Sequence, residues 1–80
     1  MVDETDKISD TKRQLELAQK YVHACARLIE EQVRLVVAMR KMNESTADAE
    51  HTLEIMIEFQ VAHIVHRDRL RKALRDAGAS

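Results

Sequence analysis

Apolar residues recur with helical spacing along two long stretches that are separated by a short polar turn. The first stretch covers residues 10–43 and the second covers residues 46–77, with the turn at residues 43–46. Proline is absent and the single glycine, Gly78, follows the last periodic residue, so neither stretch contains a helix breaker. The pattern predicts an all-α chain, preceded at residues 1–9 by a flexible acidic N-terminal segment.

The two predicted helices have similar lengths and a short connection, which favours an antiparallel helical hairpin over residues 10–80. Ser45, with Asp48 three residues later, resembles an N-terminal capping box for the second helix. Gly78 suits a C-terminal stop. One continuous helix is the alternative, because residues 43–46 are poor helix formers without being breakers. A domain-swapped dimer of such continuous helices also stays open.

The apolar arc on each helix is too wide for one neighbour to cover. With residues placed 100° apart around the axis, the arc spans roughly 200° on the first helix and more in the middle of the second. One neighbouring helix covers only about 100°. We therefore expect the hairpin to dimerise into a four-helix bundle with coiled-coil packing, although a different helical partner protein would satisfy the same requirement. The predicted interface core consists of Leu28, Val36, Leu53, Met56, Phe59 and Ile64.

Polar residues interrupt these arcs and are predicted to form a buried polar layer: Gln32, Gln60, His63 and Arg67. If the chain turns near residues 44–45, Gln32 and Gln60 come to similar heights and His63 falls near Ala26. Such a layer typically fixes register and oligomeric state. A ligand site in the bundle core is the alternative interpretation.

Few residues suggest chemistry. His63 and His66 have HxxH spacing near Glu58, but the two histidines point about 60° apart and Glu58 lies on the polar strip, so no metal site is predicted. Cys25 lies on an apolar face without a basic neighbour to activate its thiol. The chain contains no glycine-rich loop to hold a phosphate. We therefore expect a protein that is not an enzyme and needs no cofactor.

The formal net charge of -1 provides no overall field toward nucleic acid or an anionic membrane. The longest apolar run, residues 35–39, is far too short to span a membrane. One cysteine cannot form an internal disulfide, and a cytoplasmic location is expected. Locally, a basic segment near the C-terminus makes nucleic-acid binding, or contact with an acidic partner, the alternative function. It consists of Arg67, Arg69, Arg71, Lys72 and Arg75.

Charged residues also form rows along both predicted helices. The basic row on the first helix recurs every seven residues: Lys20, Arg27, Arg34 and Lys41. The acidic ridge on the second helix consists of Glu50, Glu54 and Glu58. Such rows are usually solvated faces, and a neighbouring helix of opposite charge is the alternative. Taken together, the sequence predicts a small adaptor or regulator that works through protein contacts as a homodimeric helical bundle.

Overall fold

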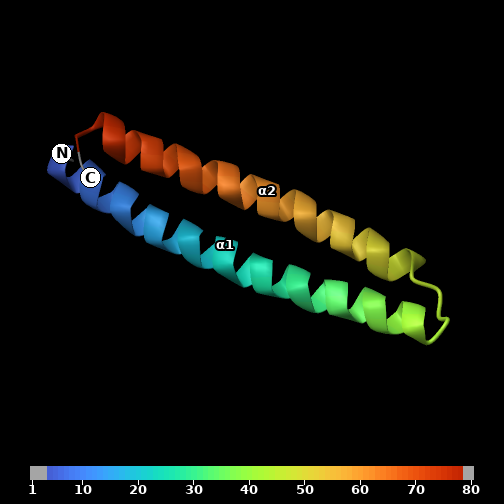
Figure 1. Ribbon diagram of the computed structural model, residues 1–80. Helices are drawn as coiled ribbons and strands as arrows, with labels where there is room; N and C mark the ends of the chain where they lie inside the picture. The colour runs from blue at the N-terminus through green and yellow to red at the C-terminus, as the bar shows by residue number, and fades with distance from the viewer. Residues whose placement is uncertain (1–3, 79–80) are drawn as a thin grey trace.

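The computed structural model describes residues 4–78 and consists of two long helices packed side by side (Figure 1). Helix α1 is Glu4–Lys41 and helix α2 is Ala47–Asp76. The helices are antiparallel, so the start of α1 and the end of α2 lie at one end and the turn lies at the other (Figure 1). The molecule measures 60 × 20 × 14 Å. The predicted all-α hairpin is confirmed, and the two helices are not one continuous helix.

Residues that repeat at alternating intervals of three and four form the seam between the helices, as in an antiparallel coiled coil. On α1 the seam consists of Ile8, Thr11, Leu15, Ala18, Val22, Cys25, Ile29, Gln32, Val36 and Met39. On α2 it consists of Ala49, Leu53, Met56, Gln60, His63, Arg67, Leu70 and Leu74. Within the described residues, the buried apolar side chains are Ala18, Val22, Val36 and Leu74. The other seam residues are only half-buried, so the hairpin has a thin core.

Helix α1 ends because Asn43 adopts a left-handed backbone conformation, with φ at 58°. The Asn43 N–H donates to the Arg40 carbonyl at 3.1 Å, and the Glu44 N–H donates to the Met39 carbonyl at 2.9 Å. These two bonds make a Schellman motif, which satisfies carbonyls that would otherwise lack partners at the helix end. Asparagine tolerates the left-handed conformation better than most residues with a side chain. The conformation of Asn43 is therefore the physical reason why the chain turns at the predicted position.

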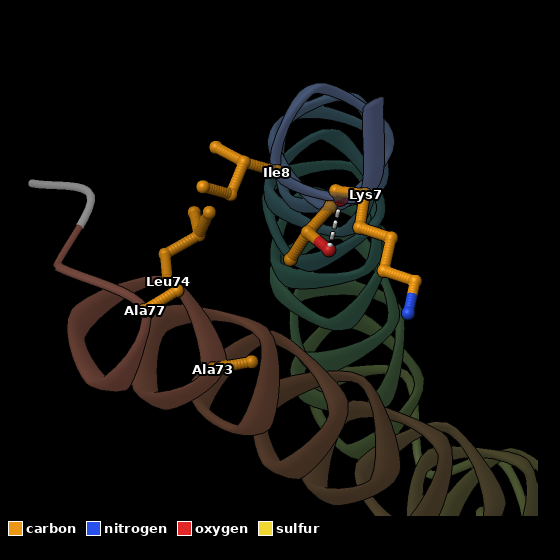
Figure 2. Close-up of a pocket in the computed structure, with 6 residues that line it drawn as sticks. Lys7, Ile8, Ala73, Leu74 and Ala77 are labelled. Carbon is orange, nitrogen blue, oxygen red and sulfur yellow. Dashed lines mark hydrogen bonds between the residues drawn. The ribbon is translucent and has the colours of Figure 1, made fainter. Parts of the chain in front are cut away.

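Helix α1 begins earlier than the predicted residue 10. Residues 4–9, which we expected to be flexible, are part of the helix, while residues 1–3 of that segment lie outside the described residues. Across the open end of the hairpin, Ile8 and Leu74 point toward each other (Figure 2) and line one shallow hollow. This apolar contact extends the seam beyond the predicted start, which explains why the helix reaches so far.

Helix α2 begins at Ala47, and its N-cap is Thr46 rather than Ser45. No side chain makes a capping hydrogen bond there, so the predicted capping box is wrong. Thr46 is half-buried at the position that continues the α2 seam, which indicates that packing rather than a cap sets the start of the helix. The other end agrees with the prediction: Gly78 has φ at 76°, and its N–H donates to the Arg75 carbonyl at 3.0 Å.

The left-handed conformation of Asn43 leads to a first prediction. Asn43→Ala should lower the free energy of unfolding by about 1 kcal/mol, because alanine tolerates positive φ poorly. Asn43→Gly should match or exceed the wild type, since glycine adopts this conformation without a steric cost. Urea unfolding followed by circular dichroism at equal chain concentration measures both changes. An alanine variant as stable as the wild type would contradict the proposed role of Asn43.

Candidate interaction surface

A second row of apolar side chains runs along each helix beside the seam and faces solvent. On α1, four large residues are between 48 and 52% exposed: Leu17, Tyr21, Leu28 and Leu35. On α2, Ile55 is 39% exposed and Phe59 is 61% exposed. Ala24 and Ala62 continue these rows at helical spacing. We call this surface the Tyr21–Phe59 face; it consists of Leu17, Tyr21, Ala24, Leu28, Leu35, Ile55, Phe59 and Ala62.

The two rows lie on the same side of the hairpin. They meet at an open groove of about 290 Å³, lined by Tyr21, Ala24, Cys25 and Leu28 of α1 and Met56, Phe59 and His63 of α2. A second hollow, of about 260 Å³, shares Ala24 and Leu28 with this groove and reaches the charged residues Arg27 and Glu31. The Tyr21–Phe59 face is therefore one continuous apolar surface that crosses both helices and is bordered by charge.

The size of this face is at the upper limit of what a soluble single chain exposes. Six large apolar side chains at about half exposure correspond to an area on the order of 600 Å², which is the upper end of the ~300–600 Å² patches found on soluble monomers. Such patches commonly mark binding surfaces for other proteins. An area on the order of 600 Å² is about a tenth of the 6326 Å² of surface that the chain exposes.

The structure divides the six predicted interface residues into two groups. Leu28 and Phe59 lie on the Tyr21–Phe59 face. The other four are buried or half-buried in one chain: Val36, Leu53, Met56 and Ile64. The predicted interface core omits the other large residues of this face: Leu17, Tyr21, Leu35 and Ile55. Their spacing was a usable signal, because dividing the broad apolar arc of each helix into two separate heptad rows identifies them.

The predicted polar residues lie at different heights along the seam. The side-chain amide of Gln32 donates to the Ala49 carbonyl at 2.9 Å, whereas that of Gln60 donates to the Val22 carbonyl at 2.9 Å. Positions 22 and 32 of α1 are separated by roughly 15 Å at the helical rise, so the expected common height of the two glutamines is wrong. The two glutamines would be level only if both helices continued, at 1.5 Å per residue, up to a hinge near residue 44. Residues 42–46 are not helical, and extended backbone covers about twice the length per residue, which shifts α2 along α1.

The same shift moves His63. The ring of His63 stacks on Tyr21, with ring centroids 5.9 Å apart, so His63 does not lie at Ala26 as expected. The guanidinium of Arg67 donates to the carboxylate of its neighbour Asp68 at 3.1 Å. These polar residues are spread along the seam rather than gathered in one layer. Their role in fixing register or oligomeric state stays a prediction.

The predicted basic segment is partly neutralised by acidic residues of the same helix. Besides Arg67, Asp68 also lies 4.0 Å from Arg71, and Lys72 pairs with Asp76 at 2.8 Å. The hydrogen bond and charge of Lys72 hold the pKa of the exposed Asp76 carboxyl below its usual value. These pairs reduce the positive potential that a phosphate backbone would meet.

Other candidate chemistry is limited in the part of the chain that the structure describes. Between residues 4 and 78, no three histidine, cysteine, aspartate or glutamate side chains lie close enough together to hold a metal ion. Cys25 is half-buried, with its Sγ 3.7 Å from the Met56 carbonyl oxygen. Neither α1 nor α2, over the described residues, is long and apolar enough to cross a membrane.

Comparison with protein-family models, curated proteins and solved structures finds no match to this chain. What the described side chains offer is a broad apolar contact area, with a basic row along one border, rather than a cluster of reactive groups.

Gln60 leads to a second prediction. Its side-chain oxygen is buried without a hydrogen-bond donor among the described residues. Replacing it by an apolar side chain of similar size removes this unsatisfied acceptor, so Gln60→Leu should raise the free energy of unfolding by about 1 kcal/mol. Gln32→Leu is the matched control and should gain less, because only the oxygen of Gln60 is enclosed. Urea unfolding compares the two, and a Gln60→Leu variant less stable than Gln32→Leu would contradict the packing described here.

The ion pairs of the basic segment lead to a third prediction. Purified protein should show no salt-dependent binding to duplex DNA or structured RNA, because the segment is partly neutralised and the whole chain is slightly acidic. Fluorescence anisotropy across a series of salt concentrations measures this. Binding that weakens steeply with added salt, and that is lost in Arg69→Ala and Arg75→Ala variants, would favour a nucleic-acid-binding bundle instead.

Proposed function

We propose that this chain is a non-enzymatic protein–protein interaction module, an adaptor or regulator, that works as a homodimeric four-helix bundle in the cytoplasm. The observation that carries the proposal is the Tyr21–Phe59 face. Six large apolar side chains are about half exposed there, while only four apolar side chains are buried in the described part of the chain. A partner is therefore needed to complete the core.

The energetics favour association. Covering an area on the order of 600 Å² on each copy, at ~25 cal/mol/Å², contributes on the order of 10 kcal/mol per copy before the costs of association and side-chain ordering. A chain of this size with a single cysteine, and with no metal-binding cluster among residues 4–78, has little other means of stabilisation. Dimerisation would thus supply a large part of the stability of the fold.

A second copy of the chain suits the geometry. The exposed row on each helix is about 100° around the helix axis from the seam, which is close to the angle between the two neighbours of a helix in a four-helix bundle. The same face is present on both copies, so a two-fold arrangement covers both at once. Apolar residues on the other side of the hairpin would stay accessible to a further protein, in keeping with an adaptor role: Val33, Val37, Ile57 and Val61.

Replacing a residue of the face tests this function. Phe59→Asp should weaken dimerisation by at least about 100-fold, because it buries a carboxylate without a partner in the apolar interface. Val61→Asp is the matched control: Val61 is also more than half exposed, on the same helix, but lies outside the Tyr21–Phe59 face. Sedimentation equilibrium should give the control about twice the chain mass of 9.2 kDa at concentrations where Phe59→Asp does not dimerise.

A milder variant and a melting experiment guard against loss of folding. Phe59→Ala removes contact area without adding charge, and it should weaken dimerisation while the control stays unchanged. The thermal midpoint of the wild type should rise with chain concentration, as it does for any folded state that depends on association. Equal dimerisation by Phe59→Asp, Phe59→Ala and Val61→Asp would contradict the proposal.

A further inference from the structure

The two borders of the Tyr21–Phe59 face differ in charge. The border on α1 carries a row of exposed basic residues seven positions apart: Arg13, Lys20, Arg27, Arg34 and Lys41. Arg13 is already paired with Asp10 at 2.6 Å, and Glu31 lines the second hollow together with Arg27. The border on α2 is acidic in the half near the turn, where Asp48 and Glu58 are exposed. Its other half carries Arg69 and Lys72, of which Lys72 is already paired with Asp76. A second copy packed on this face would therefore meet different charges in different orientations.

A two-fold axis lying in the interface allows two orientations. If the axis is parallel to the helices, both turns lie at the same end and α1 packs against α2 of the partner subunit. If the axis is perpendicular to the helices, the turns lie at opposite ends and each helix packs against its own copy. These two orientations bring different side chains together, so the residues of the face distinguish them.

We propose that two copies associate through the Tyr21–Phe59 face with both turns at the same end, so that α1 packs against α2 of the partner subunit. This inference rests on the proposed function, which requires a dimer but leaves its orientation open. Two independent features of the described residues support it: the match of large and small side chains, and the match of charge.

The first feature is the sizes of the facing side chains. Rotation about an axis parallel to the helices does not change the position of a residue along the helix direction. Residues of α1 and α2 that are level within one chain are therefore also level between the two chains. The Gln60 amide bonds to the Val22 carbonyl, and Tyr21 stacks on His63. Counting from these contacts, Phe59 is level with Ala24, and Ala62 is level with Tyr21, to within about one helical rise of 1.5 Å.

The two aromatic side chains of the face therefore each meet an alanine of the partner subunit. The ring of Phe59 of the partner subunit would lie over Ala24, in the groove that Tyr21 and Leu28 border. By symmetry, Tyr21 would lie against Ala62 of the partner subunit. Large side chains opposite small ones allow two surfaces to interdigitate without voids or overlap.

The second feature is the charge along the borders. The contacts of Cys25 with Met56 and of Gln32 with Ala49 show which residues of α1 and α2 are level. In the same-end orientation, Glu58 of the partner subunit is therefore level with the interval between Lys20 and Arg27. Asp48 of the partner subunit is level with Arg34. In the opposite-end orientation, the basic row of α1 would face the same row of the other copy. Like charges brought together across an interface disfavour association, so charge favours the same-end orientation.

Distance measurement between spin labels tests the orientation directly. A single cysteine is introduced as Glu44→Cys at the exposed turn, in a Cys25→Ala background, and labelled. Pulsed electron paramagnetic resonance should then give a distance within about 25 Å between the two labels, because both turns lie across one bundle whose helices are 8–10 Å apart. Opposite-end packing would separate the labels by roughly 55 Å, the length of the 38-residue α1 at 1.5 Å per residue.

The outcomes separate this inference from the proposed function. A short distance in a sample with the mass of a dimer supports the orientation. A dimer with the long distance overturns the orientation and leaves the proposed dimer intact. A sample that sedimentation shows to be a single chain overturns both.

Charge reversal gives a second, independent readout. In the same-end orientation, Arg27→Glu and Glu58→Arg should each weaken dimerisation, by about threefold or more per ion pair, and the double variant should recover it. The double variant Arg13→Glu with Glu58→Arg is the control and should not recover, because Arg13 lies roughly 20 Å from Arg27 along the same row. Tighter dimerisation by Arg27→Glu alone would indicate that the basic rows face each other, and would overturn the proposal.

Discussion

The structure depends on how large a part of the surface of one helix, measured as an angle around its axis, a neighbouring helix can cover. A neighbouring helix covers about 100° of a helical surface, and here that stripe is the seam of α1 and α2. The apolar residues outside the seam are left facing solvent, among them Leu28 and Phe59. The hairpin by itself thus leaves a large apolar face uncovered. The proposed dimer and its role in protein contacts follow from this one geometric limit, whereas the proposed orientation depends on the sizes and charges of the facing side chains.

The turn has a larger effect than its length suggests. Asn43 ends α1 by adopting a left-handed conformation, and the non-helical residues up to Thr46 set where α2 begins. That starting point fixes which residues are level across the hairpin, such as Gln60 with Val22. In the same-end orientation, these levels also decide which residues meet between copies. A change in the length of the turn would therefore alter both the seam and the match between the faces of two subunits.

Much of the fold follows from periodicity alone. The spacing of apolar residues predicts both helices, and the polar turn and Gly78 predict where they stop. The register between the two helices could not be predicted from periodicity, because the distance that the backbone covers through residues 42–46 depends on their conformation. For this reason the sequence predicts Gln32 and Gln60 at the same height, which the structure contradicts. The start of α1 at Glu4 depends on a contact between Ile8 and Leu74, which are distant in sequence. Of the Tyr21–Phe59 face, only Leu28 and Phe59 were predicted as interface residues, because the single broad apolar arc was not divided into two separate rows.

The measurement that tests this account most directly is the mass of the wild-type chain in solution at micromolar concentration, together with its melting behaviour. Sedimentation equilibrium should give about twice 9.2 kDa, and the thermal midpoint should increase as the protein is concentrated. A single chain that melts cooperatively at a temperature independent of concentration would mean that the seam alone stabilises the fold. That result would contradict the central claim that the Tyr21–Phe59 face must be covered.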